Sequence, residues 1–359
     1  MTIKKVQVIA LLHAQHNCQI MRRIFILLLL IGILSGGAGL YALIENEQPV
    51  VPRPVVVRQE HDKRLFDIKP VDLSVRDRHH VLLDPAFMKI YDDHLYVFDA
   101  GNYKIKRFTL TGDFLGEIID GRGEGPGEVI TPSDFFVRGT RIWILDPNPR
   151  RISIFKTDGT YLSSFSIPDL AIRMAPVGET IVLLTLMSPD LFLLVDSTGK
   201  EIRRFGNPLE EQVNDRLALD GNLVPVGDDE FIYVPFYAGY FFYHDTNGRL
   251  VKSIEMIDGF PLPSEANRIT NNGRIMQAPK GKIKNLSIAI HNNALYVFTK
   301  FTDTGRKYFL DRYDAKTGAY IGSGAVPISF ARKGLVYNDQ LYCVQDTTVV
   351  SFYLSREGD

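Results

Sequence analysis

A short apolar run rich in β-branched and aromatic residues recurs along the chain. Its six copies are LYVFD (95–99), IWILD (142–146), IVLLT (181–185), FIYVP (231–235), LYVFT (295–299) and LYCVQ (341–345). A residue-glycine turn follows each copy, at Gly112, Gly159, Gly199, Gly248, Gly318 and Gly358. Most intervals between copies are roughly 40–50 residues, which is the length of one propeller blade. Two independent landmarks therefore give the same count of repeats.

The first copy is the clearest, within residues 87–129. Ile105–Leu110 alternates apolar and polar residues, as a strand with one buried face does. Thr111-Gly112 supplies a two-residue turn, and Phe114–Ile119 is the next expected strand. A four-stranded antiparallel meander of this kind is too small to bury its own apolar faces, so it needs neighbours of the same type. The pattern predicts an all-β fold, a six-bladed β-propeller of four-stranded antiparallel blades.

The sixth copy lacks one strand. It ends just after the turn at Gly358, so its outermost strand is missing from the carboxyl end. Phe66–Val75, before the first blade, reads as a strand without a meander of its own. We therefore expect this amino-terminal strand to complete blade six and close the ring.

The amino-terminal region carries a targeting signal. Ile24–Ile44 contains no charge and follows Met21-Arg22-Arg23, the pattern of a secretory signal or of an uncleaved anchor. The positive-inside rule then places the body on the periplasmic or cell-envelope side, with 24–44 as the inner-membrane anchor if it is not removed. We divide the chain into a start-site extension or cytoplasmic stub (1–20), a signal peptide or signal anchor (21–44), a proline-rich spacer (45–61) and the propeller (62–359).

Charge and cysteine content exclude two classes of protein. Four of the 41 basic residues lie in residues 1–44, which hold no acid, so the remainder has 37 bases against 42 acids. A mildly acidic body without a basic stripe argues against nucleic-acid binding. Two cysteines, Cys18 and Cys343, do not form a disulfide framework.

The sequence LYVFDAGNYKIKRF, continued by Thr111-Gly112 and by GRGEGPGEV at 121–129, resembles NHL-repeat-like six-bladed propellers. It is especially similar to exported bacterial proteins of the TolB-like group. The resemblance covers residues 62–359 and implies the propeller fold and export. Many exported members of that group carry a lipobox cysteine after the signal, and this chain has none.

Four unusual segments are expected on one face of the ring, which we call the upper face. This face carries the joins between blades and the turns between second and third strands. The segments are Gly121–Glu128, Asn207–Gly221, the insertion Asp258–Lys284 and the aromatic turn at 235–243. Long loops on a rigid scaffold are where binding residues gather. The candidate ligand-binding residues are Tyr237, Tyr240, Phe236, Arg122, Glu124, Asp99, Asp146, Arg173 and Arg332.

Each candidate also has a structural interpretation. Asp99 and Asp146 end second strands, where aspartates commonly accept hydrogen bonds from nearby backbone amides. Gly121–Glu128 lacks the helix and the lysine of a phosphate-binding loop, so it is interpreted mainly as a tight turn. Tyr237 and Tyr240 are placed either to stack on a sugar or peptide or to pack beneath the insertion.

No catalytic motif is present: the sequence contains no nucleophile elbow and no zinc signature, and the pair His79-His80 lacks ligand spacing. One alternative remains. Asp134, Asn222 and Asn285 lie near the starts of inner strands, where three oxygen donors can hold calcium. Lactonase-type six-bladed propellers use such a site, but Arg173 and Arg332 in the same channel would repel a cation.

We therefore expect an exported, membrane-associated, non-catalytic propeller without a cofactor, which binds a peptide, a glycan or a partner protein through its upper-face loops. The alternatives are a calcium-dependent hydrolase or lactonase, and a structural scaffold of the envelope.

Overall fold

The computed structural model describes residues 56–57, 68–74, 82–119, 121–209, 213, 216–259, 266–271, 274–279, 285–301 and 307–355. Residues 1–20 and 21–44, assigned above to an extension and a signal or anchor, lie outside this set, as does most of the spacer. Among the described residues, no helix is long and apolar enough to cross a membrane.

The first three blades are antiparallel meanders of consecutive strands. Blade one comprises β3 (Pro85–Tyr91), β4 (His94–Asp99), β5 (Lys104–Thr109) and β6 (Phe114–Ile118). Blade two comprises β9 (Asp134–Arg138), β10 (Arg141–Asp146), β11 (Arg151–Lys156) and β12 (Tyr161–Ser166). Blade three comprises β13 (Ala171–Val177), β14 (Thr180–Thr185), β15 (Phe192–Val195) and β16 (Glu201–Phe205). The recurring apolar run is the second strand of each blade, as predicted.

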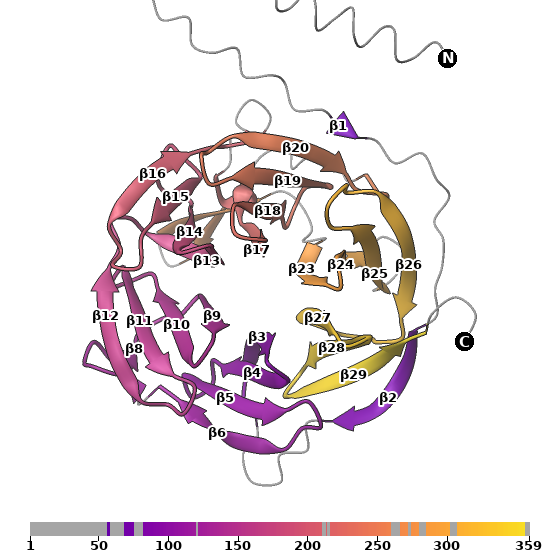
Figure 1. Cartoon of the computed structure of the whole chain (residues 1–359), viewed down its shortest axis with the longest axis horizontal. Helices are drawn as coiled ribbons and strands as arrows, with labels where there is room; N and C mark the ends of the chain where they lie inside the picture. The colour runs from indigo at the N-terminus through magenta and orange to yellow at the C-terminus, as the bar shows by residue number, and fades with distance from the viewer. Residues whose placement is uncertain are drawn as a thin grey trace, which may run out of the picture. The chain divides into compact units, whose positions relative to one another are not determined.

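The remaining blades keep this order around the ring (Figure 1). Blade four comprises β17 (Gly221–Val226), β18 (Glu230–Pro235), β19 (Tyr240–Asp245) and β20 (Leu250–Glu255). Blade five comprises β23 (Asn285–His291), β24 (Ala294–Phe301), β25 (Lys307–Asp314) and β26 (Tyr320–Val326). Blade six comprises β27 (Lys333–Tyr337), β28 (Gln340–Gln345), β29 (Thr348–Leu354) and β2 (Ile68–Ser74). The predicted six-bladed propeller is confirmed.

Ring closure occurs in the predicted way. β2 pairs antiparallel with β29, with Ile68 opposite Leu354 and Val71 opposite Ser351. The first part of the propeller therefore supplies the outermost strand of the last blade, which joins the two ends of the ring by backbone hydrogen bonds.

Short elements join the blades or cover their edges. Between blades one and two lie β7 (Gly121–Arg122) and β8 (Glu128–Val129), and before blade four lies η1 (Arg216–Leu219). The long insertion contains an antiparallel hairpin, β21 (Ala266–Asn271) and β22 (Arg274–Pro279), and β22 contacts η1. β1 (Val56–Val57) adds in parallel to the outer strand of blade four, a pairing that the sequence did not predict.

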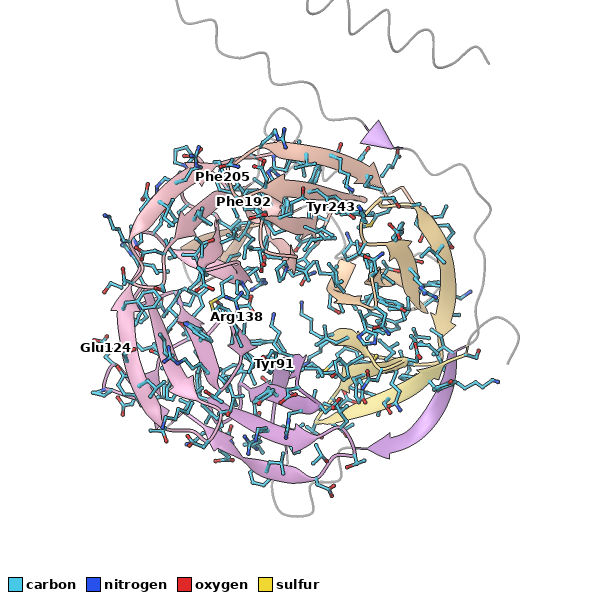
Figure 2. All side chains as sticks on the ribbon, in the orientation of Figure 1. Tyr91, Glu124, Arg138, Phe192, Phe205 and Tyr243 are labelled. Atoms are coloured by element: carbon cyan, nitrogen blue, oxygen red, sulfur yellow. The ribbon has the colours of Figure 1, made fainter. Side chains whose placement is uncertain are left out.

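The hydrophobic core lies between adjacent blades. Phe192 of blade three, for example, has its ring centroid 5.1 Å from that of Phe231 in blade four. Figure 2 shows such side chains filling the space between sheets, whereas Glu124 lies at the rim of the ring. The Phe192 ring also lies 5.6 Å from that of Phe205. The blades are thus rigidly packed, and they hold the inner strands around the central axis.

Candidate functional site

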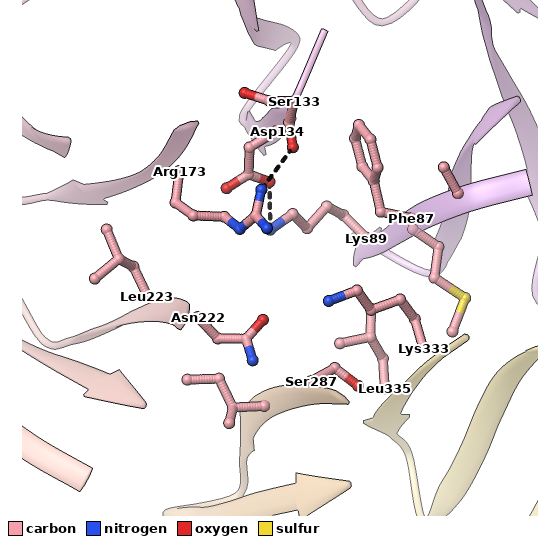
Figure 3. Close-up of a pocket in the computed structure, with 13 residues that line it drawn as sticks. Phe87, Lys89, Ser133, Asp134, Arg173, Asn222, Leu223, Ser287, Lys333 and Leu335 are labelled. Atoms are coloured by element: carbon pink, nitrogen blue, oxygen red, sulfur yellow. Dashed lines mark hydrogen bonds and ion pairs between the residues drawn. The ribbon is translucent and has the colours of Figure 1, made fainter. Parts of the chain in front are cut away.

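The central channel contains a polar cavity toward its upper end. Residues of all six inner strands line it. These strands surround the central axis (Figure 1). The cavity has a volume of about 320 Å³. Its polar lining, shown in Figure 3, consists of Lys89, Ser133, Asp134, Arg173, Asn222, Ser287 and Lys333. This volume is within the range of sites for small ligands or single groups of larger ones.

Two ion pairs cross between blades in the cavity wall. The Lys89 ammonium lies 3.1 Å from Asp134 Oδ1, and Arg173 Nη2 lies 3.0 Å from Asp220 Oδ2. Asp134 also accepts hydrogen bonds from the backbone amides of Phe135 and Met174. Burial raises the pKa of Asp220, although the Arg173 and Lys333 cations partly oppose this rise. Each pair therefore joins one basic side chain to one carboxyl group.

Lys333 is the remaining cation, and it has no carboxylate ion-pair partner in the part of the chain that the structure describes. Its ammonium donates a hydrogen bond to the backbone carbonyl of Leu286 at 2.6 Å. It also lies over the Phe236 ring, 4.7 Å from the centroid. Desolvation by burial, together with the charge of Arg173, lowers the pKa of Lys333 to about 7. The cavity therefore has a surplus of positive charge at Lys333 when this residue is protonated.

Several buried polar atoms around the cavity lack a hydrogen-bond partner among the described residues. They are Ser133 Oγ, Asp220 Oδ1, Asn222 Nδ2 and Asn285 Oδ1. A buried polar atom without a partner costs about 1–3 kcal/mol, so such atoms usually mark the position of a water molecule or a ligand group. The unpaired donor of Asn222 and the Lys333 ammonium together favour a ligand group that accepts hydrogen bonds and carries negative charge.

The structure places only some of the predicted ligand-binding residues at the cavity. Arg173 lines the cavity, and Phe236 is buried behind it, where Arg173 and Lys333 both contact the ring face. Tyr237 and Tyr240 are partly buried, and the Tyr240 ring stacks on Phe242. Of the aromatic turn, Phe236 thus contacts two cations of the cavity, and Tyr240 packs against the core between blades three and four.

Asp99 and Asp146 occupy equivalent positions at joins between blades. Both are fully buried at the end of a second strand. Asp99 accepts hydrogen bonds from the amides of Leu83 and Asp84 at 2.9 and 2.7 Å, and Asp146 accepts two from Ile130 and Thr131. Burial alone would raise the pKa of Asp99, but these amide bonds and Lys106 outweigh it and hold the pKa below its ordinary value. This is the turn-capping role that the sequence offered as the alternative to ligand binding.

The other charged candidates lie away from the cavity lining. Arg122 stacks on the Tyr103 ring at 4.7 Å, and Glu124 is exposed, with its backbone carbonyl accepting a hydrogen bond from Arg151. Arg332 forms an ion pair with Asp84 at the join of blades six and one. Gly121–Glu128 is a tight turn closed by the Glu128 carboxylate, which accepts from the Gly125 amide at 2.8 Å.

The residues proposed as calcium ligands do not form a set that fits calcium. Asp134 is already neutralised by Lys89, and the Asn285 side-chain amide donates to the carbonyls of Pro235 and Ala238. Over the described residues, no cluster of three or more His, Cys, Asp or Glu side chains is placed to hold a metal. Because Lys89, Arg173 and Lys333 line the same cavity, the local charge disfavours a divalent cation.

Sequence reasoning missed Lys89, Asp220, Ser287 and Lys333 as members of the site. They lie on or just before inner strands, which differ in sequence from blade to blade, so no shared motif marks them. Lys89 and Lys333 are charged residues on the strand just before a recurring apolar run, and that position is the signal that could have found them.

Comparison with known proteins agrees with the architecture. A family model described as "6-bladed beta-propeller" matches residues 55–181. No curated protein matches the chain. A solved structure of a putative exported protein from Bacteroides fragilis NCTC 9343 is similar, with a TM-score of 0.56 and 12% identity over 84% of this chain and 99% of that one. A member of the DUF4221 family from Bacteroides vulgatus ATCC 8482 is similar at a TM-score of 0.55 and 13% identity, over 82% and 99%. The strand order shows a six-bladed β-propeller fold, and the family match over residues 55–181 agrees with it.

Proposed function

We propose that this protein is a non-catalytic binding propeller whose channel mouth receives an acidic group of its ligand. The observation that carries the proposal is Lys333, whose neighbouring cations in the cavity wall are already paired with carboxylates. Lys333 is partly charged at neutral pH, and an acidic ligand group beside it would favour its charged form. A carboxylate or sulfate of the ligand would supply the missing negative charge and accept from the unpaired Asn222 Nδ2.

The surroundings support a ligand larger than the cavity. Asp220 directly follows η1, and η1 contacts the β21–β22 hairpin of the long insertion. The hairpin, η1 and the charged cavity therefore lie on one side of the ring. Long elements clustered beside a pocket on a rigid scaffold provide contact area for a peptide, a glycan or a partner protein.

We also propose export, with residues 21–44 as the signal or membrane anchor. The support is the uncharged run at 24–44 behind two arginines. The similar structure from Bacteroides fragilis is described as a putative exported protein, which is consistent with this proposal. The acidic group would then belong to a ligand of the cell envelope or of the medium.

The calcium-dependent hydrolase is not favoured. A reaction that relies on a divalent cation would need carboxylates free of cationic partners, whereas Lys89 occupies Asp134. A purely structural scaffold of the envelope would leave the unpaired polar atoms around the cavity without a role.

An array experiment tests the proposal. The purified protein is applied to oligosaccharides with and without uronic acids and to peptides with free or amidated carboxyl termini. We expect retention by members that carry an acidic group and loss of retention when that group is esterified or amidated. Retention by neutral members at equal strength would refute an acid-binding channel mouth.

A further inference from the structure

The amine of Lys333 is placed for a reaction as well as for binding. Lys333 begins β27 and lines the cavity, and Figure 3 shows its side-chain nitrogen directed into the space between Asn222 and Lys89. The residue keeps partial exposure, so small molecules in the cavity can reach it. The Lys333 nitrogen donates a hydrogen bond to the Leu286 carbonyl oxygen, and this contact with a neutral acceptor holds the nitrogen in position.

The groups that face Lys333 disfavour its charged form. Arg173 from β13 and Lys89 from β3 repel a third cation, and the Phe236 ring excludes water from one side. Asp220 and Asp134 favour the charged form, but each is paired with one of those neighbouring cations. At neutral pH a substantial part of Lys333 is therefore the free amine, since its pKa is lowered to about 7.

The same cavity offers a place for a carboxylate beside the amine. Arg173, the Asn222 amide and the Ser133 hydroxyl are donors in the wall, and the last two have atoms without partners among the described residues. A molecule with a carbonyl next to a carboxylate would place its acid on these donors and its carbonyl carbon toward Lys333. The cavity of about 320 Å³ has room for such a molecule.

We infer that Lys333 reversibly captures small 2-oxo acids or similar carbonyl compounds as an imine. The nitrogen lone pair forms a bond to the carbonyl carbon, and the carbonyl π electrons move to oxygen. The nitrogen then loses one proton and the oxygen takes one up, which gives a carbinolamine. Loss of water then leaves the C=N double bond. The overall step is amine plus carbonyl giving imine plus water, so it needs no oxidant or reductant. Asp220, whose Oδ1 is unpaired, is the nearby carboxyl group suited to pass the protons.

Borohydride trapping tests this inference. The purified protein is incubated with pyruvate at pH 7, reduced with sodium borohydride and analysed by intact mass and peptide mapping. A lysine with a pKa of about 7 has on the order of a thousandfold more free amine at this pH than an ordinary lysine. We therefore expect one reduced pyruvyl adduct per chain, mapped to Lys333, with a yield that falls steeply below about pH 6 as the amine becomes protonated.

Two variants complete the test. Lys333→Arg keeps a positive charge but cannot form an imine under these conditions, so the adduct should disappear. Lys307→Arg, at an exposed lysine of blade five, should leave the adduct unchanged. Adducts spread over exposed lysines in the wild type, or equal labelling of Lys333→Arg, would overturn the inference. The inference rests on the proposed function only in using the same cavity. If Lys333→Arg still binds acidic ligands but forms no adduct, acid binding and imine formation are shown to be separate properties.

Discussion

His244 gives a quantitative prediction about stability. This residue is buried in blade four, its ring is stacked on Phe231 at 5.5 Å, and the Phe192 ring lies 4.9 Å away. Neither ring nitrogen has a hydrogen-bond partner among the described residues. Desolvation lowers the pKa of His244 to about 3, and the nearby Asp245 carboxylate offsets only part of this effect. The folded protein therefore holds His244 neutral.

The sign and size of the pH effect follow from linkage. Unfolding restores the ordinary pKa of about 6.5, so the unfolded state binds a proton more readily than the folded state. The contribution of His244 to the free energy of unfolding is therefore fully present above about pH 6.5, and it is lost progressively as the pH falls toward 3. Between pH 7 and pH 5 the protein should lose about 2 kcal/mol through His244 alone.

The assay compares urea unfolding, followed by circular dichroism, at pH 7 and pH 5 for the wild type and His244→Phe. The variant cannot take up the proton, so its loss between the two pH values should be smaller by about 2 kcal/mol. Phe205→Leu is the control, because it disturbs the same aromatic cluster without changing a titratable group. Equal pH-dependent losses in the wild type and in His244→Phe would refute the reasoning.

Three further predictions concern closure, capping and metal binding. Deletion of residues 62–76 removes β2 and exposes the edge of β29, so the thermal midpoint should fall far more than after removal of residues 1–20; a midpoint that barely moves would argue against closure. Asp99→Asn removes the charge that pairs with the buried Lys106, so the free energy of unfolding measured in urea should fall by about 3–5 kcal/mol. The control Asp113→Asn, on an exposed turn, should lower it far less. Calcium chloride should leave the thermal midpoint unchanged; a saturable rise, abolished by Asp134→Asn, would restore the calcium alternative.

Much of the fold could be predicted because it depends on local pattern. The apolar runs and the turns after them repeat at the spacing of a blade, and the missing outer strand of blade six left β2 as its natural completion. The capping alternative for Asp99 and Asp146 was also accessible, since an aspartate at the end of a buried strand has few other uses. The blades and caps need only residues that are close in sequence, and closure followed from the count of strands in blade six.

The site could be predicted only in part, because it depends on residues brought together by the ring. Arg173 was recognised, but its partner Asp220 is on another blade and Lys333 is 160 positions away along the chain. Lys333 stands out because the neighbouring cations, Lys89 and Arg173, are already paired with carboxylates, and that pairing exists only in the assembled cavity. The parallel addition of β1 to blade four was likewise unpredictable, because two valines in a spacer carry no signal for a particular edge.

The central claim is that the channel mouth binds an acidic ligand group through Lys333. Its most direct test is the affinity of one acidic ligand retained on the array, measured by calorimetry for the wild type, Lys333→Met and Lys307→Met. A hydrogen bond to a charged group contributes about 1.5–3 kcal/mol, so Lys333→Met should weaken binding by roughly tenfold or more. Lys307→Met, in which an exposed lysine is lost, should bind as the wild type does. Equal affinities for the wild type and Lys333→Met would contradict the claim.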